Sequence, residues 1–382
     1  MTISKSVKVL MLVSSLRKAG PIIVVQNILK NINRKLIDVE IVKLMDDEPE
    51  RSITSEFEDD GFIVHELHLS KILIEVCPKR EAAKLNALIK SINPDIIHIH
   101  GYQCNRIITH LFTYVPILET IHSILPEDYR MTYGRLIGSY MTSNHLKGLK
   151  KVTAIAAISN TVKKFCETNL INKDIECIYN GVKVPKPISR QEARMSLNLN
   201  PKTRVFTVIG TLSFQKDPLT VIRAFLQAFS EGDEDVRLIF VGKGPLMKQC
   251  RKTAETEQRI EFIGWSPLAY TYLVASDYSI CASKSEGFGL NFIESLINGT
   301  PVIGSSIPTF KEFFNLFPEL GKYSFTPGDV DSLAHSFYEA YNNTIDMNNF
   351  KTTICDMFTA PVMSFNYTRK YLALVGQKQA EI

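Results

Sequence analysis

The sequence lacks the features that define several large classes of protein. No apolar run in its 382 residues reaches the ~18–20 residues that a bilayer-spanning helix needs. None of the seven cysteines forms a C-x-x-C pair, which excludes zinc-finger and thioredoxin-like sites. Internal repeats and low-complexity segments are absent as well. We therefore expect a soluble globular protein, and the scattered cysteines favour a reducing, cytoplasmic compartment.

Several catalytic motifs are also missing. The chain has neither the G-x-x-x-x-G-K-[ST] loop of P-loop nucleotide binders nor the G-x-S-x-G turn of serine hydrolases. Gly242 and Gly244 resemble the start of a dinucleotide fingerprint, but Met247 occupies the third glycine position. A tight strand-to-helix turn is predicted there instead. His98 and His100 share one strand face without an obvious third ligand, so no metal site is predicted.

Charge is modest overall but unevenly distributed. The net charge is +4, and the excess lies before about residue 186. A solvated face is the simplest interpretation of the basic cluster in this part. The alternative is attraction to an anionic membrane surface or a phosphorylated acceptor. Nucleic-acid binding is not expected, because the basic residues do not alternate with aromatic ones. The cluster comprises Arg130, Arg135, Lys147, Lys150, Lys151, Lys163 and Lys164.

Strands and helices alternate along both halves of the chain, which predicts parallel α/β sheets. The length favours two domains. Pro185, Pro187 and Pro201 interrupt the pattern and indicate a linker. The expected domains are residues 1–185, a linker at 186–203, a second domain at 204–360 and a C-terminal helix within 361–382. Apolar spacing places this helix at 364–377, with Tyr367 and Tyr371 on one side.

Predicted strands in the first half cover residues 7–13, 39–44, 62–67, 95–100, 116–120 and 152–157. Those in the second half cover residues 204–209, 236–241, 260–263, 278–281 and 301–304. Polar or glycine-bearing loops follow many of these strands. Ligands bind at the carboxyl ends of strands in open parallel sheets. We therefore expect the functional residues within or beside the loops at 14–20, 101, 122, 210–211, 242–244 and 283–289.

The stretch 282–304 is the most informative part of the chain. It holds two glutamates, Glu286 and Glu294, with a glycine-flanked loop at 287–289. Apolar spacing after the loop predicts a short helix that ends at Gly299. The loop would thus lie at a helix N-terminus, where free N–H groups and partial positive charge favour a phosphate.

The two glutamates also suggest a glycosidase, but their spacing argues against one. Glycosidase carboxyl groups lie ~5 Å apart or ~6.5–9.5 Å apart across one sugar. Glu286 is expected in the loop and Glu294 well inside the following helix, where they could hold two parts of one elongated ligand. Lys216, between a strand and a helix, could neutralise a diphosphate. Taken singly, each residue could also be an ordinary loop acid, helix acid or solvated lysine.

Together these motifs resemble a retaining glycosyltransferase of family 4. Residues 285–303 are similar to the family's E-x7-E element and the strand after it. Further segments resemble other motifs of the family and occur in the family's order along the chain. They are Lys216 with 210–212, 241–245, 262–265, 275–277 and 179–182, and in the first half 19–20, 98–101 and 120–122. The resemblance implies an α/β protein of GT-B fold. Two Rossmann-like, doubly wound domains would face a central cleft, and the C-terminal helix would cross back onto the first domain.

The resemblance also implies residue roles. Glu294 would bind the ribose hydroxyls, Glu286 the hydroxyls of the transferred sugar, and Lys216 the diphosphate. His122 would face the sugar near its reacting carbon, and Gly20 would allow close approach of the first domain's loop. The catalytic residues would be Glu286, His122 and Lys216. The donor site would comprise Gly20, Thr211, Lys216, Glu286, Gly287, Phe288, Gly289, Leu290 and Glu294.

The implied activity is a metal-independent, retaining transfer of a hexosyl or N-acetylhexosaminyl group. The donor would be a nucleoside-diphosphate sugar, with no further cofactor, and the acceptor a glycan or a polyprenyl- or lipid-linked glycan in cell-surface polysaccharide biosynthesis. A peripheral position on the cytosolic face of the inner membrane is a further expectation. Thr211 stands where the family usually has arginine. It leaves open a non-catalytic subunit that binds a partner transferase, and a sugar-nucleotide epimerase is a third alternative.

Overall fold

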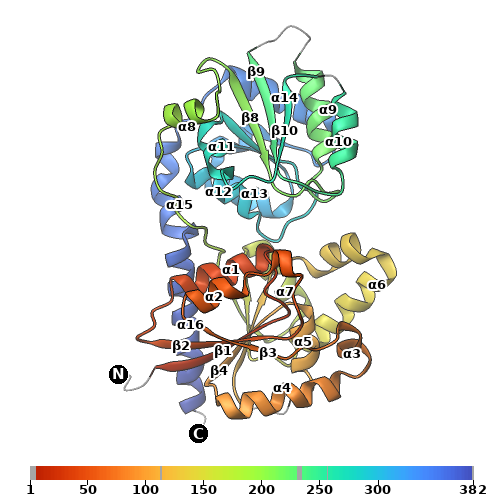
Figure 1. The fold of residues 1–382 in the computed structure, drawn as a ribbon, viewed down its shortest axis with the longest axis vertical. Helices are drawn as coiled ribbons and strands as arrows, with labels where there is room; N and C mark the ends of the chain where they lie inside the picture. The colour runs from red at the N-terminus through yellow and green to blue at the C-terminus, as the bar shows by residue number, and fades with distance from the viewer. Residues whose placement is uncertain (1–5, 112–113, 230–234, 256, 381–382) are drawn as a thin grey trace. The chain divides into compact units, whose positions relative to one another are not determined.

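A computed structural model of the chain describes residues 6–111, 114–229, 235–255 and 257–380. The chain forms two compact units, each built around a parallel sheet (Figure 1). The first unit contains the chain up to Gly181 together with the segment from Phe358 onward, and the second runs from Val182 to Met357. The predicted α/β class is therefore confirmed in both halves.

The first unit has a seven-stranded sheet whose central strands are buried and mostly apolar. Such strands are typical of parallel sheets that are covered by helices on both faces. The strands are β1 (Val7–Val13), β2 (Ile37–Lys43), β3 (Ile63–Glu66), β4 (Ile96–His100), β5 (Ile117–Ile121), β6 (Ala154–Ala157) and β7 (Asp174–Cys177). Their order is β3-β2-β1-β4-β5-β6-β7, so the direction of winding reverses between β1 and β4.

Eight α-helices accompany this sheet in the described part of the first unit. One of them, α6, lies where the sequence analysis assigned no element. It is helical except at Gly134, whose φ of 79° and ψ of 174° interrupt it. The helices are α1 (Gly20–Lys30), α2 (Thr54–Asp59), α3 (Lys71–Val76), α4 (Pro78–Ile92), α5 (Tyr102–Ile108), α6 (Leu125–Leu149), α7 (Asn160–Asn169) and α16 (Ala360–Ala380).

The C-terminal helix α16 packs against α1, β1 and β4 of the first unit (Figure 1). Tyr367 and Tyr371 are fully buried on its inner side, as the sequence spacing predicted. The Tyr371 hydroxyl shares a 2.7 Å hydrogen bond with Nδ1 of His98. The Thr120 hydroxyl lies 2.8 Å from Nε2 of His98 and 2.9 Å from the Tyr367 hydroxyl. Buried hydrogen bonds therefore join the end of the chain to β4 and β5.

Replacing Tyr371 with phenylalanine should lower the free energy of unfolding by about 1–3 kcal/mol. The change keeps the ring but leaves Nδ1 of buried His98 without its partner, and an unsatisfied buried polar group carries that cost. Urea unfolding would measure it. Tyr338→Phe is the matched control, because Tyr338 is exposed on the second unit. Equal stability of the two variants would show that the His98 bond contributes nothing.

The second unit has a six-stranded parallel sheet with strand order β10-β9-β8-β11-β12-β13. Its strands are β8 (Arg204–Ile209), β9 (Val236–Val241), β10 (Ile260–Gly264), β11 (Tyr278–Cys281), β12 (Val302–Ser305) and β13 (Ser324–Phe325). Winding reverses between β8 and β11. The accompanying helices are α8 (Arg190–Ser196), α9 (Pro218–Ala228), α10 (Met247–Ala254), α11 (Ala269–Ala275), α12 (Leu290–Ile297), α13 (Pro308–Leu316), α14 (Val330–Asn342) and α15 (Lys351–Phe358).

Residues 186–203 lie in the second unit rather than between two units. Ser189 and Glu192 form a capping box at the start of α8. Arg194 is buried and donates a 2.8 Å hydrogen bond to Asp277, which also pairs with Arg190 and Arg204. This ion-pair cluster holds residues 186–203 against the second unit. The prolines of this segment had suggested a linker.

All seven cysteines fall among the described residues, and none is paired in a disulfide. Within the same residues, no helix combines the length and the apolar character that crossing a membrane requires.

Candidate active site

Two loops meet at the winding reversal of the second sheet. One follows β8 and spans residues 210–217; the other follows β11 and spans residues 282–289. Gln215 joins the two loops through two hydrogen bonds. Its backbone carbonyl accepts from the Lys284 N–H at 2.8 Å, and its side-chain amide donates to the Ser285 carbonyl at 2.8 Å. The Lys284 ammonium lies 3.2 Å from the Asp217 carboxylate. The predicted loops thus form one surface.

Lys216 and Glu286 are brought together on this surface. Nζ of Lys216 lies 2.5 Å from Oε1 of Glu286, and both side chains are largely buried. The Ser283 hydroxyl donates to the same oxygen at 2.8 Å, and the Thr309 hydroxyl donates to the Glu286 carbonyl at 2.7 Å. From the sequence these two charged residues were expected to hold separate parts of a ligand, and their direct pairing is new in the structure.

Glu294 completes a group of three charges. Burial raises its pKa, while the positive charge of Lys216 opposes the rise. Burial alone would lower the pKa of Lys216, but attraction to Glu286 outweighs it and the pKa is raised. Lys216 therefore stays charged near neutral pH, paired with Glu286 and close enough to Glu294 for their charges to interact. Such a group offers a cation for an anionic ligand and carboxylate acceptors for hydroxyls.

The loop at 287–289 positions the N-terminus of α12. Gly289 has φ of +85°, and a Cβ atom there would lie 2.4 Å from the Phe310 ring. Phe288 is buried and packs edge-on against Phe313 at 5.3 Å between ring centroids. Phe288 anchors the loop. The first N–H groups of α12, those of Leu290 and Asn291, precede the helix's own hydrogen bonds, and the next one, Phe292 N–H, donates to the Gly289 carbonyl at 3.0 Å. The helix therefore begins directly after the loop, as predicted, and its N-terminus lies near the charged group.

The loops after β8 and β9 are also in close contact. Gly242 has φ of +152°, and a Cβ atom there would lie 1.9 Å from the Gly210 carbonyl oxygen. The predicted tight turn at this position is confirmed. Thr211 is exposed in the loop after β8, and the N–H of the next residue, Leu212, donates to the Lys243 carbonyl at 3.1 Å.

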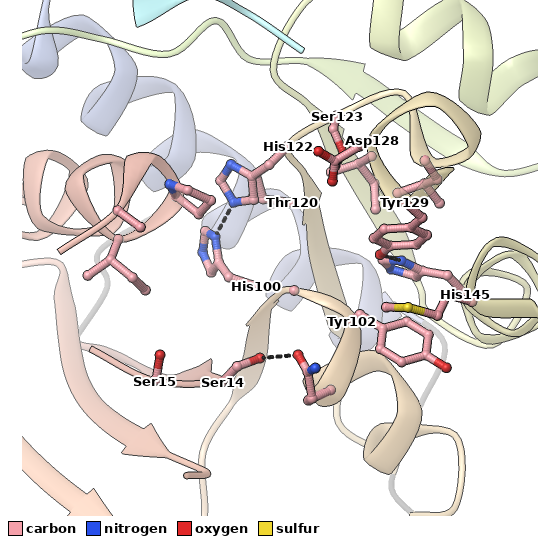
Figure 2. A pocket seen from close by; sticks show the side chains of 18 of the residues that line it. Ser14, Ser15, His100, Tyr102, Thr120, His122, Ser123, Asp128, Tyr129 and His145 are labelled. Carbon is pink, nitrogen blue, oxygen red and sulfur yellow. Dashed lines mark hydrogen bonds between the residues drawn. The ribbon is translucent and has the colours of Figure 1, made fainter. Parts of the chain in front are cut away.

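The first unit has a cavity of about 240 Å³ at the carboxyl ends of β1, β4 and β5 (Figure 2). His122 follows β5 and lines it, so the strand delivers this histidine where the sequence placed it. Gly20 begins α1 between two lining residues, Ala19 and Pro21, and a Cβ atom there would meet open space. Of the predicted site residues, His122 and Gly20 thus belong to the first unit and the rest to the second.

Three neutral histidines lie along β4 and at the end of β5. Nδ1 of His100 and Nε2 of His122 share a 2.9 Å hydrogen bond (Figure 2), so one ring donates and the other accepts. Burial lowers the pKa of His122 to about 4 and that of His98 to about 3, and it lowers the pKa of His100 as well. At neutral pH His122 can therefore exchange hydrogen bonds with a hydroxyl but carries no charge.

These histidines should make the first unit sensitive to acid. Their usual pKa of 6.5 applies in the unfolded chain, so protons favour unfolding once the pH falls below that value. Between about pH 7 and about pH 5, His98 and His122 should each cost about 2 kcal/mol of stability. Urea unfolding at both pH values would measure the loss. His122→Gln should lose less stability on acidification than the parent, and an equal loss would contradict the assignment.

A second buried network lines the same cavity and was not found in the sequence. Glu119 is fully buried and lies 2.6 Å from Nε2 of His145, whose Nδ1 lies 2.6 Å from the Tyr129 hydroxyl (Figure 2). The Asn105 amide donates to Glu119 at 2.6 Å. Burial holds the pKa of Tyr129 well above its usual value. Tyr129 and His145 come from α6, so missing that helix hid this part of the cavity.

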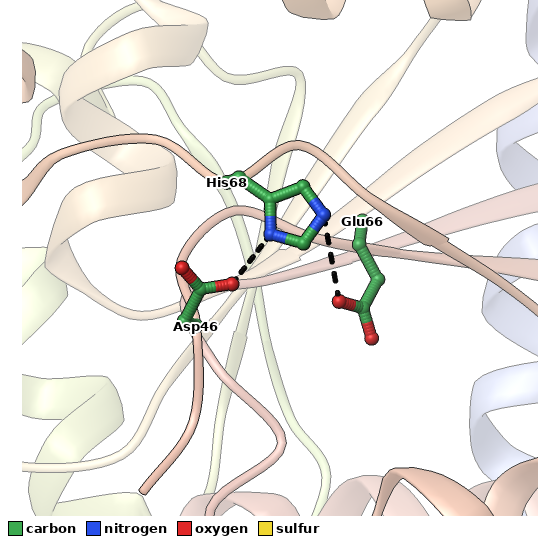
Figure 3. A group of neighbouring side chains, drawn as sticks. All are labelled: Asp46, Glu66 and His68. Atoms are coloured by element: carbon green, nitrogen blue, oxygen red, sulfur yellow. Dashed lines mark hydrogen bonds and ion pairs between the residues drawn. The ribbon is translucent and has the colours of Figure 1, made fainter.

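Asp46, Glu66 and His68 form a separate exposed cluster (Figure 3). Nδ1 of His68 lies 2.5 Å from Asp46, and Glu66 pairs with Lys43 at 2.8 Å. These groups are already partnered by one another and by Lys43. We therefore interpret the cluster as a surface ion-pair network.

Two parallel-sheet, Rossmann-like units in one chain agree with the GT-B fold expected from the sequence, and in each unit polar residues lie at the winding reversal, where such sheets bind ligands. The family model "Glycosyl transferases group 1" matches residues 189–354, and the model "Glycosyltransferase Family 4" matches residues 20–185. The chain therefore belongs to the family 4 glycosyltransferases.

Curated relatives are distant but agree in class. The chain is 28% identical over 249 residues to the alpha-monoglucosyldiacylglycerol synthase of Streptococcus pneumoniae, covering 61% of this chain and 55% of the synthase. It is 27% identical over 237 residues to an Escherichia coli galactosyltransferase named for GlcNAc-diphosphoundecaprenol, and this match covers 58% of this chain and 60% of the galactosyltransferase. It is 24% identical to the Escherichia coli O-antigen biosynthesis glycosyltransferase WclY, covering 95% of this chain and 98% of WclY.

Solved structures share the fold over nearly the whole chain. Sucrose-phosphate synthase from Thermosynechococcus elongatus has a TM-score of 0.79 at 17% identity, covering 97% of this chain and all of that one. Anabaena HepE, solved with UDP and glucose, has a TM-score of 0.75 at 17% identity, and the match covers 96% of this chain and all of HepE. At these identities the likeness establishes the fold.

Proposed function

We propose that the protein is a retaining glycosyltransferase that uses a nucleoside-diphosphate sugar as donor. The observation that carries the proposal is the group of Lys216, Glu286 and Glu294 beside the N-terminus of α12. It combines a cation and free N–H groups, which suit a diphosphate, with two carboxyl groups, which suit ribose and sugar hydroxyls. The match of the family models to both units supports it.

In this proposal the second unit holds the donor. Glu294 binds the ribose, Glu286 the transferred sugar, and Lys216 with the N–H groups near Gly289 the diphosphate. As the bond to the sugar breaks, negative charge develops on the diphosphate, and Lys216 stabilises it without a metal ion. The leaving phosphate then takes the proton of the attacking acceptor hydroxyl on the same face of the sugar.

The cavity of the first unit is the proposed place for the acceptor. Its lining mixes hydroxyls, aromatic rings, neutral His122 and the charged side chains of Arg17 and Asp128, a set that suits the many hydroxyls of a sugar. Relatives named for a glucosyldiacylglycerol and for a diphosphoundecaprenol-linked sugar support a lipid-linked glycan acceptor. We therefore place the enzyme in cell-surface glycan synthesis at the cytosolic face of the membrane.

A thermal-shift screen of hexosyl and N-acetylhexosaminyl nucleotides tests the donor site. A true donor at a hundred times its Kd stabilises the protein by about 2.7 kcal/mol. Lys216→Met should abolish the shift, whereas Lys248→Met, at an exposed position of α10, should leave it unchanged. If no nucleoside diphosphate stabilises the chain and no nucleotide sugar is hydrolysed, the proposal fails.

Product analysis separates the remaining alternatives. A transferase forms glycosylated acceptor from the isolated chain. A non-catalytic subunit binds nucleotide without product, and an epimerase releases an altered sugar without an acceptor. Only the first outcome agrees with the proposal.

A further inference from the structure

The middle of α6 is exposed to an unusual degree. Every residue from 130 to 137 is exposed, and several are large and apolar. Leu136 is 86% exposed and Ile137 58%. In Figure 1, α6 projects to one side of the first unit's sheet. We call the following residues the α6 surface: Arg130, Met131, Tyr133, Arg135, Leu136, Ile137 and Tyr140.

The helix is held at both ends, so this exposure is not a consequence of loose packing. Leu125 and Tyr129 are buried before the surface, and Met141, His145 and Leu149 are buried after it. Gly134 breaks the helix between the two anchored parts. Single exposed apolar side chains are ordinary, but a contiguous group of them marks a site of interaction. The fold thus holds the α6 surface out toward solvent.

The charge of this region has one sign. No acidic residue occurs between Asp128 and Glu167. Arg130 and Arg135 lie within the α6 surface, and the Lys71 ammonium of α3 lies 5.5 Å from the centroid of the Tyr133 ring. Glu127, in the first turn of α6, is the nearest exposed acid in sequence. The surface is therefore apolar and basic together.

We propose that the α6 surface docks the protein onto an anionic lipid bilayer. Leu136 and Ile137 enter the boundary between headgroups and acyl chains, and Arg130 and Arg135 pair with lipid phosphates. Tyr133 and Tyr140 suit this depth, because tyrosine places an apolar ring and a polar tip at a membrane interface. An apolar patch that carries basic residues complements anionic lipid better than it complements neutral lipid.

This inference rests on the proposed function and explains how a lipid-linked acceptor could be reached. Tyr133 belongs to the α6 surface and also lines the cavity of the first unit. Tyr129 and His145, from the buried parts of the same helix, line the cavity too. Docking through α6 therefore brings the mouth of the proposed acceptor cavity to the bilayer surface.

Vesicle sedimentation without nucleotide or acceptor tests the docking. The protein should bind vesicles of phosphatidylcholine mixed with phosphatidylglycerol, bind phosphatidylcholine alone weakly, and dissociate as salt is raised. Leu136→Glu should lower the partition coefficient at least about tenfold. Arg130→Gln and Arg135→Gln should each lower it about fivefold. Ile171→Glu is the control, because Ile171 is 87% exposed but lies between α7 and β7, outside the α6 surface.

Two results would overturn the docking: failure of the unaltered protein to bind phosphatidylglycerol vesicles, or undiminished binding by Leu136→Glu. A dimer that Leu136→Glu converts to monomers, seen by light scattering without vesicles, would assign the surface to a second copy instead. Nucleotide binding is measured in the same preparations. Nucleotide binding without vesicle binding overturns the docking alone, and vesicle binding without nucleotide binding overturns the transferase proposal alone.

Discussion

Replacing Glu286 with alanine should lower kcat by about a hundredfold or more. Glu286 is the proposed contact to the transferred sugar, and a hydrogen bond to a charged group contributes about 1.5–3 kcal/mol. The change also removes the partner of Lys216, whose ammonium lies 2.5 Å away. Steady-state kinetics with a nucleotide sugar and acceptor would measure the loss, with kcat and kcat/KM reported separately.

Two further variants sharpen this experiment. Glu286→Gln keeps the shape and can still accept from Ser283, so it isolates the effect of the charge. Glu319→Ala removes an exposed acid from the same unit and should leave turnover unchanged. Full activity of Glu286→Ala in folded protein would refute the role assigned to this residue.

Replacing Lys216 with methionine should cost about 10²–10³ in kcat, the range observed when one stabilising donor is removed from a developing anion. Methionine preserves most of the volume but leaves two carboxyl groups without their cation. Since Lys216 opposes the rise in the pKa of Glu294, that pKa should rise further in the variant. The acidic limb of the pH–rate profile should therefore move to higher pH.

The double variant Glu286→Ala, Lys216→Met shows whether the pair acts as a unit. If it does, the double variant should lose about as much activity as either single variant, because each single change already disables the pair. Fully additive losses would show that the two side chains act independently, despite the short contact between them. An unchanged kcat in Lys216→Met would contradict electrostatic stabilisation by this lysine.

Much of the fold could be predicted from the sequence because many of its strands are short apolar runs, several of them next to glycine or proline. Such runs identify buried parallel strands without any knowledge of tertiary contacts. The helix α6 gave no such signal. Its middle is apolar and exposed, and Gly134 interrupts it, so no amphipathic period exists. Pro126, Glu127 and Asp128 form a typical helix start and were the one local sign of it.

The partnerships within the site could not be predicted in the same way. Lys216 and Glu286 are 70 residues apart, and they meet because β8 and β11 are neighbours at the winding reversal. Arg194 and Asp277 are 83 residues apart, and their contact assigns α8 to the second unit although the surrounding prolines suggested a linker. Local composition carries no information on strand order, so the sequence indicated the residues but not their pairing.

The position of α16 has a consequence for how the protein is made. The first unit is complete only when the last helix is present, because Tyr367 and Tyr371 supply hydrogen bonds to Thr120 and His98. The ribosome makes strands β1 to β7 first, then the entire second unit, and only then α16. Domains generally fold as units during synthesis, from the N-terminus onward. In this chain that order is reversed: the second unit can finish folding while the first still waits for its closing helix.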